Sequence, residues 1–267
     1  MIILDGKTLQ KELSLNQKER FQRLGKKCLL VIVSVGENQE SEIYIRHKIK
    51  YGEDLGVLVK RLEFSENISF DDLKSEINKL NNDEGVSGII IQLPAGDFKA
   101  EKLIVLIDPK KDVDGFNKNC FVRPATARGV EELLSFYKIG IKSKKAIVVG
   151  KSLVVGKPIA EFLRNFGANV KVFDRESINI KEEAKNSEIL VFATGAVKFF
   201  NCDYIGDNLP VVIDVGISKG EDGKVCGDTD FRLCLDKVSA MTPVPGGVGP
   251  MTVWALFENL YELAVES

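Results

Sequence analysis

Three polar side chains recur at helical spacing in one segment of the sequence. Ser41, Tyr44 and Lys48 are three and four residues apart, so a helix would place them on one face. Ile45 and Ile49 lie beside this stripe, which therefore borders apolar surface. Burial lowers the pKa of a lysine, and such an amine transfers protons near neutral pH. The alternative is a lysine whose stem lies on apolar surface while its amine reaches water.

Two more polar side chains follow strand-like or turn-like segments. Gln92 comes directly after the apolar run Gly88–Ile91, where an amide either contacts a ligand or simply ends the strand. Asp114 lies in the segment Asp112–Phe116. Its carboxylate suits the amino-pyrimidine edge of a bicyclic ring, which presents paired N–H donors. The segment is equally compatible with an ordinary turn, but it lacks the later ligand positions of a calcium loop.

The segment Gly150–Pro158 has the pattern of a phosphate-binding turn between a strand and a helix. Gly150 permits a tight turn, Gly156 permits close packing, and Pro158 suits a first helical turn. The N–H groups at the start of such a helix favour a phosphate. Ser152 stands where the usual dinucleotide-binding motif has its middle glycine, so an unliganded turn remains an alternative.

The residues that end the next predicted strand bear on the choice of nucleotide. Asp174 would favour NAD by accepting a hydrogen bond from a ribose 2′-hydroxyl. Arg175 and Lys151 would instead favour NADP by pairing with a 2′-phosphate. A solvated pair of opposite charges at a strand end is the third possibility.

The composition narrows the functional classes. With 267 residues, of which 44 % are hydrophobic, the chain is long enough for two domains, and its net charge of −2 argues against a general nucleic-acid binder. A single histidine, His47, and five scattered cysteines predict no zinc site and reduced thiols. We expect no metal, no membrane span and, because no signal-peptide pattern is present, a cytoplasmic location.

Alternating strand-like and helical segments predict an α/β fold with mostly parallel sheets. The predicted strands are Leu29–Val35, Val57–Phe64, Val86–Gln92, Lys145–Val149, Val170–Phe173, Ile189–Ala193 and Val211–Val215. The predicted helices are Glu40–Leu55, Phe70–Leu80, Ala100–Leu106, Pro158–Phe166 and Thr252–Val265. The stretch Asp108–Arg128 is expected to be an irregular crossing between two domains.

Seven motifs in this order resemble one family. They are Leu4–Lys7, Ser41–Lys48, Gly88–Pro94, Lys111–Phe116, Gly150–Pro158, Val212–Ile217 and Thr242–Thr252. Together they cover nearly the whole chain and resemble the bifunctional methylenetetrahydrofolate dehydrogenase/cyclohydrolase family. The last motif, Thr-Pro-Val-Pro-Gly-Gly-Val-Gly-Pro-Met-Thr, is the most specific. The segments Ala95–Gly96 and Pro124–Gly129 depart from the family pattern.

The resemblance implies two α/β domains. Residues 1–120, with a C-terminal helix 251–267 that packs back on them, would form a folate and catalytic domain. Residues 121–250 would form a Rossmann-like NAD(P)-binding domain. The implied reactions are oxidation of 5,10-methylenetetrahydrofolate and hydrolysis of the methenyl product to 10-formyltetrahydrofolate. NADP is the expected cofactor, with NAD also possible. The expected partners are folates, with no nucleic acid or membrane, and the expected assembly is a homodimer.

The resemblance also assigns roles to individual residues. Lys48 would transfer the proton in hydrolysis, Tyr44 would stack on the folate, Gln92 would tune the lysine, and Asp114 would hold the pterin. Further substrate contacts would come from Leu93, Pro245, Gly246 and Gly247. The cofactor contacts would come from Gly150, Lys151, Ser152, Asp174, Arg175 and Ile217.

Other functions remain open at this point. The chain could be a catalytically silent folate- or nucleotide-binding paralogue, or a dehydrogenase without hydrolase activity. The presence of Lys48, Gln92 and Asp114 argues against the first, and the presence of Lys48 argues less strongly against the second. A shikimate-dehydrogenase-like enzyme would share the architecture, but it would not account for the loop at Gly246.

Overall fold

The chain divides into two compact units in the computed structural model, which describes residues 1–220 and 223–266. Unit 1 consists of Met1–Lys11 and Thr126–Thr252, and unit 2 consists of Glu12–Ala125 and Val253–Ser267. None of the helices in the described ranges has the length and apolarity needed to cross a membrane.

Unit 2 contains a small parallel sheet in the order β3-β2-β4. Its strands are β2 (Leu29–Val35), β3 (Leu58–Phe64) and β4 (Gly88–Ile91). Its helices are α2 (Gln39–Leu55), α3 (Phe70–Asn82), α4 (Ala100–Ile104) and most of α1 (Gly6–Arg23) and α9 (Val248–Glu266).

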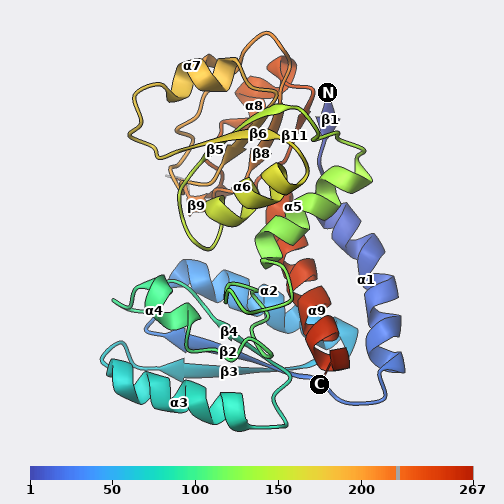
Figure 1. Ribbon diagram of the computed structural model, residues 1–267, viewed down its shortest axis with the longest axis vertical. Helices are drawn as coiled ribbons and strands as arrows, with labels where there is room; N and C mark the ends of the chain where they lie inside the picture. Colours follow the sequence, from blue (N-terminus) through green and yellow to red (C-terminus); the bar gives the residue numbers. More distant parts are fainter. Residues whose placement is uncertain (221–222, 267) are drawn as a thin grey trace. The chain divides into compact units, whose positions relative to one another are not determined.

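The sheet of unit 2 lies between two layers of helices (Figure 1). Val31, Val33 and Val35 belong to one core with Leu73 of α3 and Leu103 of α4. The opposite face is covered by α2 and α9. A Cβ at Gly88 would meet Leu30 and Leu260 of α9, and one at Gly52 of α2 would meet Phe257 of α9. The predicted packing of the C-terminal helix on this domain is therefore confirmed.

Local signals explain where α2 begins and ends. This helix carries Ser41, Tyr44 and Lys48. The side chain of Asn38 caps its start by accepting a hydrogen bond from the N–H of Ser41. Gly56 ends it in the left-handed conformation, with φ 82°, which glycine adopts without steric cost. An N-terminal side-chain cap such as that of Asn38 contributes about 1 kcal/mol to stability.

Unit 1 contains a six-stranded parallel sheet in the order β1-β11-β8-β7-β5-β6. Its strands are β1 (Ile2–Ile3), β5 (Lys145–Val149), β6 (Asn169–Phe173), β7 (Ile189–Phe192), β8 (Val211–Asp214) and β11 (Ala240–Met241). A small antiparallel pair, β9 (Ser218–Lys219) and β10 (Val225–Cys226), follows β8.

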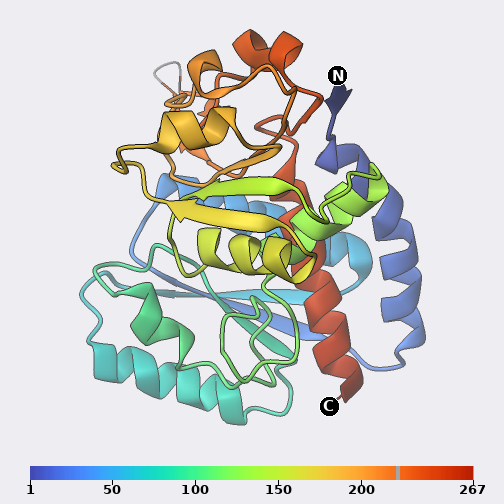
Figure 2. The same cartoon turned by 45° about the horizontal axis from the view of Figure 1, so that its top comes forward.

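The helices of unit 1 are short. They are α5 (Ala125–Phe136), α6 (Gly156–Asn165), α7 (Ile180–Lys185) and α8 (Phe231–Cys234), with the 3₁₀ turns η1 (Cys202–Tyr204) and η2 (Leu235–Lys237). Figure 2 shows α6 lying along the strands of the sheet. The chain passes from β5 to β6 on one side and then to β7 on the other side of β5. This reversal is a topological switch point, where ligands of such sheets bind.

Four sequence-based expectations differ from the structure. The stretch expected to be irregular as far as Arg128 becomes helical at Ala125, and the last helix begins at Val248 instead of Thr252. α1 was not among the predicted helices, because its apolar residues form no regular stripe. The sequence also groups residues 1–11 with the first domain, whereas β1 pairs with β11 and joins them to unit 1.

Candidate functional site

A buried lysine and a buried amide meet in unit 2. Nζ of Lys48 donates a hydrogen bond to Oε1 of Gln92 at 3.0 Å, and the two residues are 8 % and 9 % exposed. Lys48 comes from the middle of α2, and Gln92 follows β4 directly. The Gln92 Nε2 group donates to the carbonyl of Leu93 at 2.9 Å. This second bond holds the amide with its oxygen toward the lysine.

The carboxyl of Asp114 interacts electrostatically with this lysine. Burial lowers the pKa of Lys48, and the charge of Asp114 partly opposes the shift. Asp114 retains some exposed surface, but its loss of water raises its pKa to about 7, against the opposing charge of Lys48. The neighbouring carboxylate of Asp112 adds to the increase. Both groups therefore change protonation more readily near neutral pH than they would in water.

Asp114 and Leu93 line a small cavity together with apolar side chains. The other lining residues are Ile91, Leu103, Ile104, Ile107, Asp112 and Phe116. Asp112 shapes the turn, since its carboxylate accepts hydrogen bonds from the N–H groups of Gly115 at 3.0 Å and Asn117 at 2.7 Å. The sequence left two roles open for this segment, a turn and a ligand contact. In the structure Asp112 forms the turn by binding the backbone, and Asp114 faces the cavity.

Tyr44 lies one turn before Lys48 on α2 and is partly buried. The structure therefore brings Lys48, Gln92, Leu93 and Asp114 together in unit 2 and carries Tyr44 on the same helix. Pro245, Gly246 and Gly247 belong to unit 1. There the carbonyl of Gly246 accepts a hydrogen bond from the N–H of Lys7 at 2.8 Å. The substrate contacts assigned to these three residues stay predictions.

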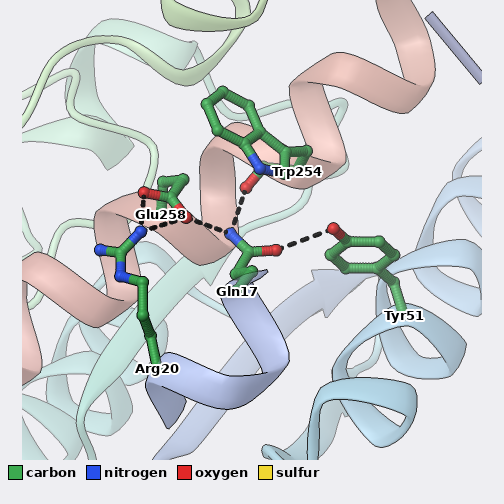
Figure 3. Close-up of polar contacts among 5 residues, drawn as sticks. All are labelled: Gln17, Arg20, Tyr51, Trp254 and Glu258. Carbon is green, nitrogen blue, oxygen red and sulfur yellow. Dashed lines mark hydrogen bonds and ion pairs between the residues drawn. The ribbon is translucent and has the colours of Figure 1, made fainter. Parts of the chain in front are cut away.

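A buried polar network fixes the part of α2 that follows Lys48 (Figure 3). The hydroxyl of Tyr51, three residues beyond Lys48, donates to Oε1 of Gln17 at 2.7 Å. Gln17 Nε2 donates to Glu258 at 2.8 Å and to the carbonyl of Trp254 at 3.1 Å. Arg20 completes the network by pairing with Glu258 at 2.7 Å. These bonds tie α2 to α1 and α9, and the network was not anticipated from the sequence.

The turn after β5 forms the second candidate site, in unit 1. A pocket of about 440 Å³ is lined by Gly150, Lys151, Ser152, Asp174, Arg175, Glu176, Ala193 and Thr194. These residues follow β5, β6 and β7, so the pocket lies at the switch point of the sheet. Five of the six residues predicted to contact a cofactor line it. Ile217 is absent from the lining among the described residues, and Glu176, Ala193 and Thr194 were not predicted.

The backbone of this turn fits a phosphate-bearing nucleotide. Gly150 has φ 128°, and a Cβ there would collide with the carbonyl of Ala193. A Cβ at Gly156 would collide with the carbonyl of Gly150. Both positions therefore require glycine. The hydroxyl of Ser152 accepts from the N–H groups of Val155 and Gly156 at 3.2 Å each, which fixes the start of α6.

The charges at the end of β6 pair with each other. Nζ of Lys151 lies 2.7 Å from Oδ2 of Asp174, with the side chains 49 % and 52 % exposed. The bond from Lys151 and a second bond from the hydroxyl of Ser177 lower the pKa of Asp174. An exposed pair of this kind is weak and readily rearranged, so Lys151 remains available to an incoming phosphate.

Two buried carboxyls, Asp214 and Asp228, lie next to the pocket-lining residue Thr194 or to each other, and no role was predicted for them from the sequence. Asp228 Oδ2 accepts from the N–H and hydroxyl of Thr194 at 2.6 and 2.9 Å. Asp214 accepts from the N–H groups of Asp228 and Thr229 at 3.1 and 2.8 Å. Burial, with the charge of Asp228 as a further cause, raises the pKa of Asp214 to about 7. Asp228 thereby holds Thr194, which lines the pocket. The one feature of the sequence that pointed to these carboxyls is Asp214, an aspartate within an apolar strand.

The comparisons with known proteins match both parts of the chain to one family. Residues 4–114 match the catalytic domain of tetrahydrofolate dehydrogenase/cyclohydrolase, and residues 124–267 match its NAD(P)-binding domain. The chain belongs to the tetrahydrofolate dehydrogenase/cyclohydrolase family. The resemblance noted in the sequence is therefore confirmed, and so is the fold class of two α/β domains with a Rossmann-like second domain.

Relatives in this family align along their full length. The bifunctional protein FolD of a Hydrogenobaculum species is 41 % identical, with 97 % of each chain covered. The crystal structure of the bifunctional FolD dehydrogenase/cyclohydrolase from Campylobacter jejuni has a TM-score of 0.94 at 36 % identity, covering 100 % of this chain and 99 % of that one. The Trypanosoma brucei enzyme, solved with NADP and an inhibitor, has a TM-score of 0.93 at 27 % identity, covering 100 % and 98 %.

Proposed function

We propose that this protein oxidises 5,10-methylenetetrahydrofolate to 5,10-methenyltetrahydrofolate with NADP and hydrolyses the product to 10-formyltetrahydrofolate. The observation that carries this function is the buried bond between Lys48 and Gln92, with Asp114 close enough to perturb the lysine. It lies within the residues that match the family's catalytic domain.

The hydrolytic step needs a group that takes a proton from water as the water attacks the methenyl carbon. Lys48 suits this role because burial favours its neutral amine, whose lone pair accepts a proton. Gln92 orients Nζ through its Oε1 atom. Water adds to the cation, the ring opens at one C–N bond, and one proton is released. General base assistance of this type contributes about 10²- to 10⁴-fold.

Asp114 is proposed to bind the pterin ring. Its ionised carboxylate accepts the paired N–H groups of an amino-pyrimidine edge. Tyr44, one turn before Lys48, is proposed to stack on the folate. Leu93 is also proposed to contact the folate. The family resemblance supports the further proposal that Pro245, Gly246 and Gly247 contact the substrate.

The oxidation step is assigned to the pocket in unit 1. NADP, when bound, accepts the hydride. Gly150, Ser152 and the start of α6 are proposed to hold its pyrophosphate, and Lys151 and Arg175 its 2′-phosphate. Asp174 competes for Lys151, so it is proposed to tune the preference between NADP and NAD. Ile217 is proposed as a further cofactor contact.

A direct assay tests both activities. Purified protein is mixed with 5,10-methylenetetrahydrofolate and either NADP or NAD, and formation and decay of the methenyl product are followed. Faster reduction of NADP than of NAD, followed by enzyme-accelerated decay, is the expected result. Reduction without accelerated decay would indicate a dehydrogenase alone. Folate binding without reduction of either cofactor would indicate a silent paralogue.

The family resemblance supports proposals for the assembly, location and partners of the protein. We propose that it is a homodimer in the cytoplasm and that it acts on folates, without nucleic acid or membrane partners. Sedimentation equilibrium at micromolar concentration tests the assembly, with a mass of twice 29.6 kDa expected. A monomer at that concentration would contradict the dimer, while leaving the assignment of the reactions to the assay above.

A further inference from the structure

Two cysteines of unit 1 lie against each other although they are 32 positions apart. Sγ of Cys202 is 3.0 Å from Sγ of Cys234, and the Cys202 thiol also lies 3.0 Å from the carbonyl of Leu233. Cys202 is partly exposed, whereas Cys234 is fully buried. This arrangement gives one thiol access to a reagent in solution and keeps the second within reach of the first.

The backbone holds these two cysteines in place. Phe200 donates to the carbonyl of Asp228 at 2.9 Å and accepts from the N–H of Asp230 at 3.3 Å. Phe200 is fully buried and stacks on Phe192 of β7. The segments that carry the cysteines, residues 198–204 and 227–234, are therefore neighbours before any covalent bond forms. Bringing the sulfur atoms together requires little rearrangement of the chain.

We propose that Cys202 and Cys234 form a reversible disulfide when the protein meets a low-molecular-weight disulfide such as oxidised glutathione. The thiolate of Cys202 attacks the small disulfide, which forms a mixed disulfide and releases one small thiolate. Cys234 then loses its proton and attacks Sγ of Cys202, releasing the second small thiolate. Two protein thiols are oxidised, and one small disulfide is reduced to two thiols.

The order of attack follows from the surroundings of the two sulfur atoms. Burial, together with the adjacent Cys202, raises the pKa of the Cys234 thiol to about 12. Only the thiolate attacks a disulfide, so the second step accelerates as the pH rises. Transient disulfides of this kind are the type found in reducing compartments.

The disulfide would join segments that support the pocket described above. Asp228, which binds Thr194, lies between the two cysteines in the sequence. Cross-linking restricts the unfolded chain and stabilises the folded unit. We therefore expect the midpoint of thermal unfolding to rise by several degrees on oxidation and to return after reduction with dithiothreitol.

The test compares the parent protein with Cys202→Ser, Cys234→Ser and the control Cys226→Ser, a partly buried cysteine of the same unit. Each is incubated with oxidised glutathione and mapped by non-reducing peptide mass spectrometry. In the parent and the control, a peptide joining Cys202 to Cys234 is expected. In Cys234→Ser, a persistent glutathione adduct at Cys202 is expected.

Two outcomes would overturn the proposal. A stable glutathione adduct at Cys202 of the parent, without the internal cross-link, would show that Cys234 does not resolve it. A cross-linked parent whose unfolding midpoint does not rise would contradict the stabilising role. Neither readout depends on enzyme activity, so both are independent of the proposed reactions.

Discussion

Nζ of Lys48 lies 3.0 Å from Oε1 of Gln92, which joins the middle of α2 to the end of β4. Both side chains are almost completely buried. A lysine in such surroundings has lost its water, and its hydrogen-bond partner Gln92 is neutral. The contact therefore favours an amine that gains and loses its proton during a reaction over one that carries a permanent charge.

Replacing Lys48 with alanine tests whether this amine transfers the proton. We expect Lys48→Ala to lower the rate of methenyl hydrolysis by at least about 100-fold, because the general base is lost. The protein should remain folded by circular dichroism. Lys50→Ala is the matched control, since Lys50 is exposed on the same helix. Normal hydrolysis by Lys48→Ala would remove the lysine from the mechanism.

The raised pKa of Asp114 predicts a pH dependence of folate binding. The carboxylate accepts N–H donors, and with a pKa of about 7 it becomes protonated as the pH falls below 7. The dehydrogenase kcat/KM at saturating NADP should therefore decrease from pH 8 to pH 6.

Two variants separate Asp114 from other groups that titrate in this range. Asp114→Asn should have a low kcat/KM at every pH and lack this decrease. Asp97→Asn, which changes an exposed carboxylate of the same unit, should retain the parent's profile. A flat profile in the parent would be incompatible with an ionised Asp114 holding the substrate.

The ion pair between Lys151 and Asp174 predicts a change in cofactor preference. Asp174→Ser removes a negative charge and releases Lys151 to bind a 2′-phosphate. The ratio of kcat/KM for NADP to that for NAD should rise several-fold, mainly through a lower KM for NADP. Asp203→Ser, which breaks a similarly exposed pair with Lys181, is the control. An unchanged ratio would place Asp174 away from the ribose.

The network around Gln17 predicts coupled losses of stability. Gln17→Leu and Tyr51→Phe each leave a polar partner unpaired, which should cost about 1–3 kcal/mol of the free energy of unfolding. The double variant should cost about 1 kcal/mol less than the sum, as measured by urea denaturation. Combining Tyr51→Phe with Asn81→Leu, whose amide bonds to Leu106 and Asp108, should give an additive loss. Additivity in both pairs would contradict the network.

The buried Asp214 predicts that unit 1 loses stability as the pH rises. Its folded-state pKa of about 7 exceeds the ordinary value of 3.8. Protonation therefore favours the folded state, and this contribution is present at low pH and lost as the pH rises through 7. Asp214→Asn should be less stable than the parent and show a flatter decrease between pH 5 and 8. Asp207→Asn, an exposed control in the same unit, should have the parent's slope, and a parental slope in Asp214→Asn would contradict this account.

Much of the fold follows from local patterns. β2 and β5 have the predicted bounds, because strands buried in parallel sheets appear as continuous apolar runs. The amphipathic helix α2 and the glycine turn at Gly150 were equally recognisable. α1 was missed because tertiary contacts, such as those of Gln17, hold it in place.

The family, the two α/β domains and the side chains able to perform the chemistry can all be recognised in the order of the amino acids. Which of these side chains meet depends on the packing of distant elements. Lys48 and Gln92 are 44 positions apart, and Thr194 and Asp228 are 34 apart. No local pattern encodes such contacts, because burial and the electric field at a side chain arise only when distant strands and helices pack together.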